Sequence, residues 1–143
     1  AAAEHHQVLL RCELALQFLF QVDVQGAEMR DALEAFLDDA LDGRPGGPEA
    51  RSYAVQLVDG VLAHKAEIDG LIRDAARNWE LERMAGVDRN VLRLGCYELL
   101  HEADVPVKVA INEAIELGKR YSTEASGAFV NGILDRIRKD KGR

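Results

Sequence analysis

The chain has 143 residues, of which 48% are hydrophobic and 30% charged, and its formal net charge is −7. This composition is typical of a folded globular domain and excludes a disordered chain. Its apolar runs fall short of the roughly 20 residues that a membrane span needs, and no signal-peptide pattern opens the sequence. Cys12 and Cys96 lack a neighbouring cysteine, so neither a zinc site nor a disulfide framework is predicted, and we expect a reduced, cytoplasmic setting.

The charge is distributed unevenly along the chain. From Val107 onward there are eight basic and five acidic residues, whereas the preceding 106 residues carry ten basic and twenty acidic ones. The net acidity argues against long-range attraction to nucleic acid, but the basic end allows local contact with phosphate. The charge therefore leaves both nucleic-acid binding and protein binding open.

The first predicted helix runs from Glu4 to about Val24 and is apolar on more than one side, which predicts burial by several neighbours. Gln17 and Phe20 lie three residues apart on its polar edge. Two interpretations of Phe20 are open: it stacks on an unpaired base, or it fills a helix interface.

Three more helices are predicted before residue 80. They cover Met29 to Leu41, Pro48 to about His64, and Ala66 to Trp79, and a loop dense in glycine and proline separates the first two. That loop lacks the lysine and the Ser/Thr of a phosphate-binding loop. Trp79, the only tryptophan, is expected to pack between two helical layers.

The fifth predicted helix begins at Val87, with Asp88 in the N-cap position. From Val91 to Leu100 it is apolar around nearly its whole circumference, so we expect it to be the central helix. One strip at four-residue spacing carries polar and aromatic residues: Arg89, Arg93, Tyr97 and His101. This strip is either an RNA-contacting surface or a partly covered edge held by salt bridges.

Two amphipathic helices are predicted between Val105 and Ile137, separated by a break at residues 122–124 that supplies capping hydroxyls. Asn112, Asn131 and Gly132 stand within them, although each lowers helix stability. We interpret the asparagines as buried amides and the glycine as a point of close helix contact; a binding surface is the alternative. No segment shows the alternation of a strand, so the sequence predicts an all-α fold.

The stretch VDRNVLRLGCYELLHEADVPVKVAINEAIELGKRYSTEASGAFVNGILDRI, from Val87 to Ile137, closely resembles the C-terminal signature of the NusB family of bacterial transcription antitermination factors. A weaker likeness lies in ELALQFLFQVD, from Glu13 to Asp23. The resemblance implies a single all-α domain of about seven helices, built from two antiparallel bundles of about three helices each that share a central helix. The bundles are expected at residues 1–79 and 80–143.

The NusB family binds the boxA element of ribosomal RNA leaders together with the ribosomal protein NusE, and so lets RNA polymerase pass terminators. The resemblance therefore implies a non-enzymatic, cofactor-free protein. Its expected partners are single-stranded boxA-type RNA, NusE and the RNA polymerase antitermination complex. The residues expected to bind RNA are Arg11, Gln17, Phe20 and Phe129, and Asp88 is expected to bind the ribosomal protein. The signature residues Asn112, Glu113, Asn131 and Gly132 are assigned mainly to structure.

The family's arginine-rich segment before the first helix is reduced here to Arg11, so we expect the chain alone to bind RNA weakly. Two alternative functions stay open. One is a protein-binding or homodimeric paralogue with weak or lost RNA binding, and the other is an accessory RNA-binding domain of an RNA methyltransferase. Catalysis is not predicted, because no hydrolase, nucleotide-binding or metalloprotease motif is present, and the four histidines are scattered.

Overall fold

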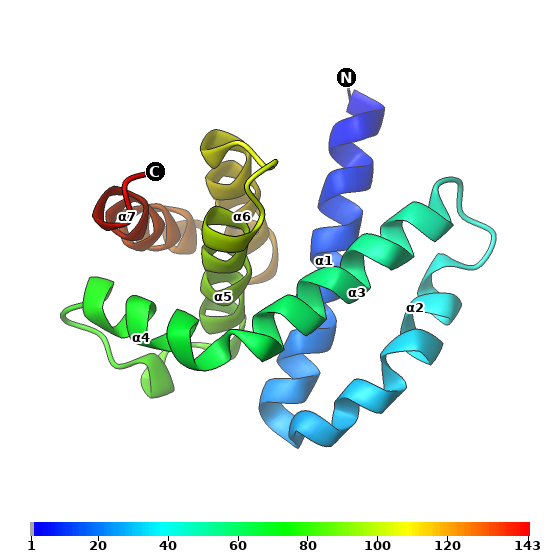
Figure 1. The fold of residues 1–143 in the computed structure, drawn as a ribbon, viewed down its shortest axis with the longest axis horizontal. Helices are drawn as coiled ribbons and strands as arrows, with labels where there is room; N and C mark the ends of the chain where they lie inside the picture. Colours follow the sequence, from blue (N-terminus) through cyan, green and yellow to red (C-terminus); the bar gives the residue numbers. More distant parts are fainter. Residues whose placement is uncertain (1) are drawn as a thin grey trace. The chain divides into compact units, whose positions relative to one another are not determined.

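The computed structural model describes residues 2–143, with side chains described from Leu9 onward. The described residues form seven α-helices and two short 3-10 helices, and no strand occurs among them (Figure 1). The elements are α1 (Ala2–Gln25), η1 (Ala27–Ala32), α2 (Leu33–Leu41), α3 (Gly47–Ala63), α4 (Lys65–Ala75), η2 (Leu81–Arg83), α5 (Gly86–His101), α6 (Val107–Tyr121) and α7 (Glu124–Asp140). The prediction of an all-α fold with about seven helices is confirmed.

The chain forms two compact units, which divide between Asp59 and Gly60 inside α3. The first unit holds α1, η1, α2 and most of α3. The second holds the end of α3 and the helices from α4 to α7. The assignment of helices to two bundles that meet at residue 79 stays a prediction.

In the first unit, aromatic packing joins α1 to α2, and an ion pair joins η1 to α3. The ring centroids of Phe18 and Phe36 lie 5.4 Å apart. The chain turns after α1 at Gly26, whose φ of 110° is a backbone conformation that favours glycine. Arg30 then donates hydrogen bonds to both carboxylate oxygens of Asp59. These contacts fix the turn between the first two helices against α3.

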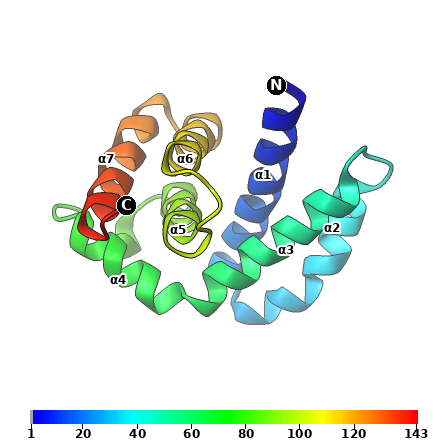
Figure 2. The same cartoon turned by 45° about the horizontal axis from the view of Figure 1, so that its top comes forward.

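In the second unit, α5 lies at the centre and contacts α4, α6 and α7 (Figure 2). A Cβ atom at Gly95 would lie 2.7 Å from Leu134 Cδ1 and 3.3 Å from Ala114 Cβ, so this glycine lets α6 and α7 approach closely. The prediction of a central helix is confirmed within this unit by its buried apolar residues, Val91, Leu92, Leu94, Cys96 and Leu99. Burial raises the pKa of the Cys96 thiol to about 12, which keeps it protonated and unreactive.

Polar partners within the second unit hold the strip at four-residue spacing on α5. Arg93 donates through Nε and Nη2 to the two carboxylate oxygens of Asp69 at 2.8 and 3.1 Å, and both side chains are buried. The Tyr97 hydroxyl donates to Glu102 at 3.0 Å. The structure therefore favours a salt-bridged, partly covered edge over an RNA-contacting surface for this strip.

The helix-disfavouring residues of α6 and α7 lie at the surface. Asn112, Asn131 and Gly132 are exposed, and a Cβ atom at Gly132 would meet nothing within 4 Å. The expectation of buried amides and of close helix contact at Gly132 is therefore wrong, because these positions face away from the apolar stripes that pack on α5. Close contact between α6 and α7 occurs instead at Gly127, where a Cβ atom would lie 3.3 Å from Ile115 Cγ2.

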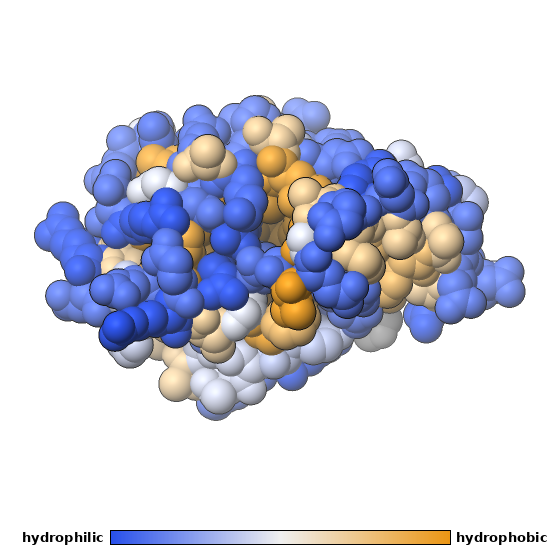
Figure 3. Space-filling model, turned by 90° about the horizontal axis from the view of Figure 1, so that it is seen from below, coloured by the Kyte–Doolittle hydropathy of each residue, from blue (hydrophilic) through white to orange (hydrophobic). Residues whose placement is uncertain are grey.

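Hydrophilic side chains cover most of the surface seen in Figure 3, and apolar side chains reach it in small groups. Among the described residues, the large apolar side chains with marked exposure are Phe20, Val24, Trp79, Val109 and Tyr121. None of the described helices combines the length and the apolarity that crossing a bilayer requires.

Candidate functional site

The loop between α4 and α5 is fixed by arginines from α5 and α7. Arg89 of α5 donates through Nη1 to the carbonyl oxygens of Leu81 and Met84 at 3.1 and 3.0 Å. Arg136 of α7 donates to the carbonyl oxygen of Ala75, the last residue of α4, at 2.9 Å. Because helix ends and loops leave backbone acceptors unpaired, these donors stabilise the loop in one conformation.

Two exposed ion pairs surround this loop. Arg73 donates to Glu82 at 2.6 Å, and this hydrogen bond holds the pKa of the Glu82 carboxyl below its usual range. Arg83 lies 3.0 Å from Glu80. Exposed pairs of this kind contribute little stability. Their effect here is to neutralise the acidic residues of the loop.

Trp79 projects from this loop and not from a helix. α4 ends at Ala75, four residues before the predicted end, and Trp79 is 62% exposed, so its expected burial between helical layers is wrong. Its ring packs edge-to-face with Phe129 of α7, with centroids 5.5 Å apart and planes at 79°. Aromatic pairs favour this geometry. An exposed tryptophan packed against a half-buried phenylalanine is typical of a binding surface.

The start of α7 places Phe129 opposite the loop. The Thr123 backbone N–H donates to Ser126 Oγ at 3.4 Å, and the two hydroxyls lie 3.3 Å apart. This reciprocal arrangement caps the helix and fixes its first turn. Phe129 lies three residues beyond the buried Ser126, on the same helix face.

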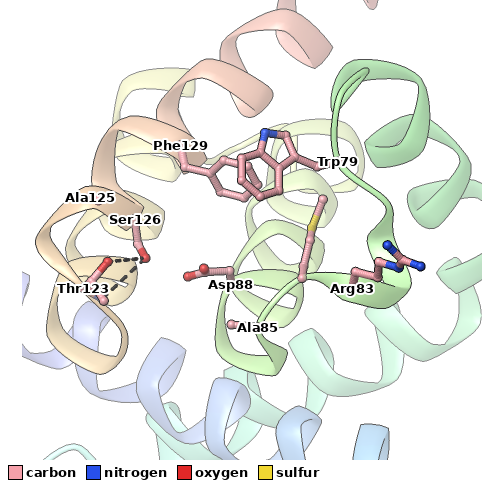
Figure 4. Close-up of a pocket in the computed structure, with 9 residues that line it drawn as sticks. Trp79, Arg83, Ala85, Asp88, Thr123, Ala125, Ser126 and Phe129 are labelled. Atoms are coloured by element: carbon pink, nitrogen blue, oxygen red, sulfur yellow. Dashed lines mark hydrogen bonds between the residues drawn. The ribbon is translucent and has the colours of Figure 1, made fainter.

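An open pocket of about 370 Å³ is lined by the loop, the start of α5 and the start of α7 (Figure 4). Its lining is mostly apolar and includes one carboxylate: Trp79, Arg83, Met84, Ala85, Asp88, Thr123, Ala125, Ser126 and Phe129. Asp88 extends from α5 toward the first turn of α7 (Figure 4). Its Oδ1 atom is buried and has no hydrogen-bond partner among the described residues.

Asp88 is not the N-cap residue that the sequence suggested. α5 begins at Gly86, one residue before the predicted start, and Ala85 occupies the N-cap position. Asp88 is therefore the third residue of the helix, where the positive end of the helix dipole stabilises a carboxylate. The helix dipole does not supply a hydrogen-bond donor, so the Oδ1 atom in the pocket wall stays without a partner among the described residues.

The Trp79–Phe129 pair also borders a second hollow of about 470 Å³. This hollow is more polar, and its lining includes two guanidinium groups, on Arg77 and Arg136, and the exposed Gly132. Both arginines are exposed. The aromatic pair thus lies between an apolar pocket with a carboxylate and a hollow with two cations, an arrangement that can hold a base and its phosphates.

The remaining predicted RNA-binding residues lie on α1 in the first unit. Arg11 is half-buried, with its guanidinium 4.1 Å from the centroid of the Tyr53 ring. Its Nε atom is buried without a hydrogen-bond partner among the described residues. Gln17 and Phe20 are both exposed, and Phe20 is 39% exposed. They share one side of α1, because residues three apart lie on the same helix face.

The sequence model of the NusB family matches residues 11–139. The chain belongs to the NusB family. It is 50% identical over 131 residues to the transcription antitermination protein NusB of Sorangium cellulosum, an alignment that covers 92% of this chain and 91% of that protein.

Two solved NusB structures share this fold. T. maritima NusB matches with a TM-score of 0.80 and 42% identity, over 94% of this chain and 90% of that one. A crystal structure of the antitermination factors NusB and NusE in complex with dsRNA matches with a TM-score of 0.82 and 27% identity, over 94% and 98% of the two chains.

The NusB-like fold brings two of the predicted residues together, since Asp88 and Phe129 line the same pocket. Arg11, Gln17 and Phe20 share α1. Their roles in binding stay predictions. Sequence reasoning missed one member of the aromatic pair, Trp79, and the two arginines of the neighbouring hollow, Arg77 and Arg136. The available signal was that the only tryptophan stands at the predicted end of a helix, a position from which a large ring readily projects.

Proposed function

We propose that this NusB-family chain acts in transcription antitermination, binding single-stranded boxA-type RNA together with a NusE-type ribosomal protein in the RNA polymerase antitermination complex. This is a binding role without catalysis, and it implies a cytoplasmic protein. The observation that carries the proposal is the exposed Trp79, packed on the half-buried Phe129, beside the unpaired Asp88 oxygen. Support also comes from the relatives named for antitermination and from the related NusB–NusE–RNA structure.

In this proposal Asp88 binds the ribosomal partner. A buried carboxylate oxygen without a donor costs roughly 1–3 kcal/mol. A lysine, an arginine or a backbone N–H from a partner would remove that cost. The net charge of −7 also suits a basic ribosomal protein, because complementary charge favours the correct pairing and speeds association.

The RNA would contact the aromatic pair and the adjacent arginines. A base stacked on Phe129 or Trp79 would contribute about 1–3 kcal/mol. Arg77 and Arg136 would contact phosphates, and each such contact would steepen the salt dependence of binding. Arg11, Gln17 and Phe20 on α1 would provide further RNA contacts.

Binding of RNA and of the protein partner should be coupled. With one arginine where the family has several, this chain alone would hold RNA weakly, and the partner would add cationic surface. Such coupling is reciprocal, so RNA should strengthen the protein pair by the same factor.

The test is fluorescence anisotropy on a boxA RNA and a scrambled RNA, with and without NusE. In the presence of NusE, we expect the boxA RNA to bind more tightly than the scrambled RNA. Phe129→Ala should weaken the binding of boxA RNA to this chain and NusE together by roughly 5- to 150-fold, equivalent to one lost stacking contact. Asp88→Asn should instead weaken the protein pair measured by calorimetry. Tyr121→Ala is the matched control, since this aromatic residue is exposed and lines neither hollow.

If the two RNAs bind equally in both conditions, the antitermination role is wrong and a protein-binding or homodimeric paralogue replaces it. If Phe129→Ala and Tyr121→Ala behave alike, RNA does not stack at this pocket. Unchanged calorimetry for Asp88→Asn would remove Asp88 from the partner interface.

A further inference from the structure

In the second unit, His101 meets a histidine and a glutamate from a distant part of the sequence, His64 and Glu67. His64 lies in the N-cap position of α4, Glu67 in the first turn of α4, and His101 at the end of α5. Glu67 Oε1 lies 2.7 Å from His101 Nε2 and 3.7 Å from His64 Nδ1. One potential ligand atom from each residue lies within 4.8 Å of the other two. The two imidazole rings stack with centroids 3.8 Å apart.

The ring of a buried tyrosine packs near both imidazole rings. The Tyr97 ring lies 5.6 Å from the His101 ring and 6.2 Å from the His64 ring, between centroids. Gly60 makes room for it, since a Cβ atom there would lie 2.2 Å from Tyr97 Cζ. The Tyr97 hydroxyl is held by Glu102. The histidines therefore rest on a fixed part of the unit.

We propose that His64, Glu67 and His101 form a binding site for a first-row transition-metal ion of the zinc class. Imidazole nitrogen and carboxylate oxygen are ligands that zinc accepts, whereas Mg²⁺ and Ca²⁺ favour sites made of oxygen alone. This site is independent of the proposed RNA and protein interfaces.

The distances between the ligand atoms suit such an ion once one imidazole ring turns. Tetrahedral zinc with bonds of about 2.0–2.1 Å places its ligand atoms about 3.3–3.4 Å apart. The observed separations of 2.7 and 3.7 Å lie on either side of that value. An imidazole nitrogen binds a metal in the plane of its ring, and these two planes lie nearly parallel, at 18°, with centroids 3.8 Å apart. One imidazole therefore has to turn before both can bind the same ion. His64 has space to turn, because its side chain is 43% exposed.

Three protein ligands leave a fourth position for water, as in open zinc sites. The side chains of Glu67 and His101 are 50% and 26% exposed, so an ion can enter from solvent. The positive charge of Lys141 acts on Glu67 and opposes a cation, which limits the affinity. A bound ion would tie the corner between α3 and α4 to the end of α5.

The test is calorimetric titration of zinc into the full chain after treatment with a chelator. We expect one ion per chain at this site, with His101→Ala and Glu67→Gln each weakening its binding by roughly tenfold or more. Zinc should also raise the melting temperature of the parent protein and not that of either variant. A joint substitution of His5 and His6 by alanine is the control, because it removes the other two histidines and leaves the proposed site intact.

Circular dichroism of each variant checks that the fold is retained, and His64→Ala provides an independent second ligand variant. Histidine side-chain NMR adds a direct readout, since zinc should shift the ring nitrogens of His64 and His101. The proposal is overturned if the parent chain binds no zinc at millimolar concentration. It is equally overturned if binding disappears with His5 and His6 but survives His101→Ala.

Discussion

Replacing Asp69 by alanine should strongly destabilise the second unit, because Arg93 would keep its charge in a buried position. The two side chains are 9% and 6% exposed and share two hydrogen bonds, at 2.8 and 3.1 Å. Removing one partner of a buried ion pair costs about 3–5 kcal/mol. Arg93 would retain its bond to Asn90 Oδ1 at 3.1 Å, which softens the loss. We therefore expect a decrease of about 3 kcal/mol in the free energy of unfolding.

Urea unfolding followed by circular dichroism measures this decrease, and a thermal scan should show the melting temperature falling by roughly 10 °C for a domain of this size. The informative control is the double variant Asp69→Leu with Arg93→Met. It removes both charges, and replacing a buried pair by apolar side chains of similar volume is often close to neutral. We expect this variant to stay within about 1–2 kcal/mol of the parent protein.

A loss well under 1 kcal/mol for Asp69→Ala would refute the reasoning, since it would mean that the guanidinium remains solvated. A double variant as unstable as the single one would show that packing, and not the loss of the ion pair, sets the cost. The folded double variant should also bind boxA RNA like the parent chain with NusE present. A marked loss of RNA affinity would instead assign the α5 strip to RNA binding.

Two further predictions follow from glycine packing and from one tyrosine. Gly95→Ala should lower the free energy of unfolding by about 1–3 kcal/mol, because its Cβ atom would lie 2.7 Å from the buried Leu134. Gly132→Ala is the matched control. It should raise the free energy of unfolding by up to about 1 kcal/mol, since nothing lies near that position and alanine favours a helix. Equal effects in chemical denaturation would contradict the structure. Burial and the hydrogen bond to Glu102 raise the pKa of Tyr97 to about 12. Because the pKa of Tyr97 is raised in the native state, its contribution to stability is complete below the unfolded pKa near 10 and is lost as the pH rises toward 12. Ultraviolet titration should show Tyr97 ionising last among the tyrosines. A Tyr97→Phe variant should remove this part of the pH dependence of stability.

The sequence alone determined the class of fold and the identity of the central helix. The reason is that helix periodicity and the all-round apolarity of residues 91–100 are local properties, which hold wherever the segment packs. The length and continuity of the match from Val87 to Ile137 likewise required no structure, and the family assignment agrees with it.

Exposure at single positions was decided by the tertiary structure. The sequence predicts a buried Trp79, but the side chain is exposed, because α4 ends at Ala75 and the loop places the ring at the surface. Asn112, Asn131 and Gly132 were assigned to the interior and face solvent. A helix pattern gives the direction of each side chain only once the end of the helix and its neighbours are known.

Only the tertiary structure brought distant residues together. Asp88 and Phe129, assigned separately to protein and RNA partners, line one pocket. His64 and His101, which the sequence shows as scattered histidines, stack where the start of α4 meets the end of α5. Such contacts depend on how helices that are far apart in the chain pack against each other. This packing forms only when the whole unit folds.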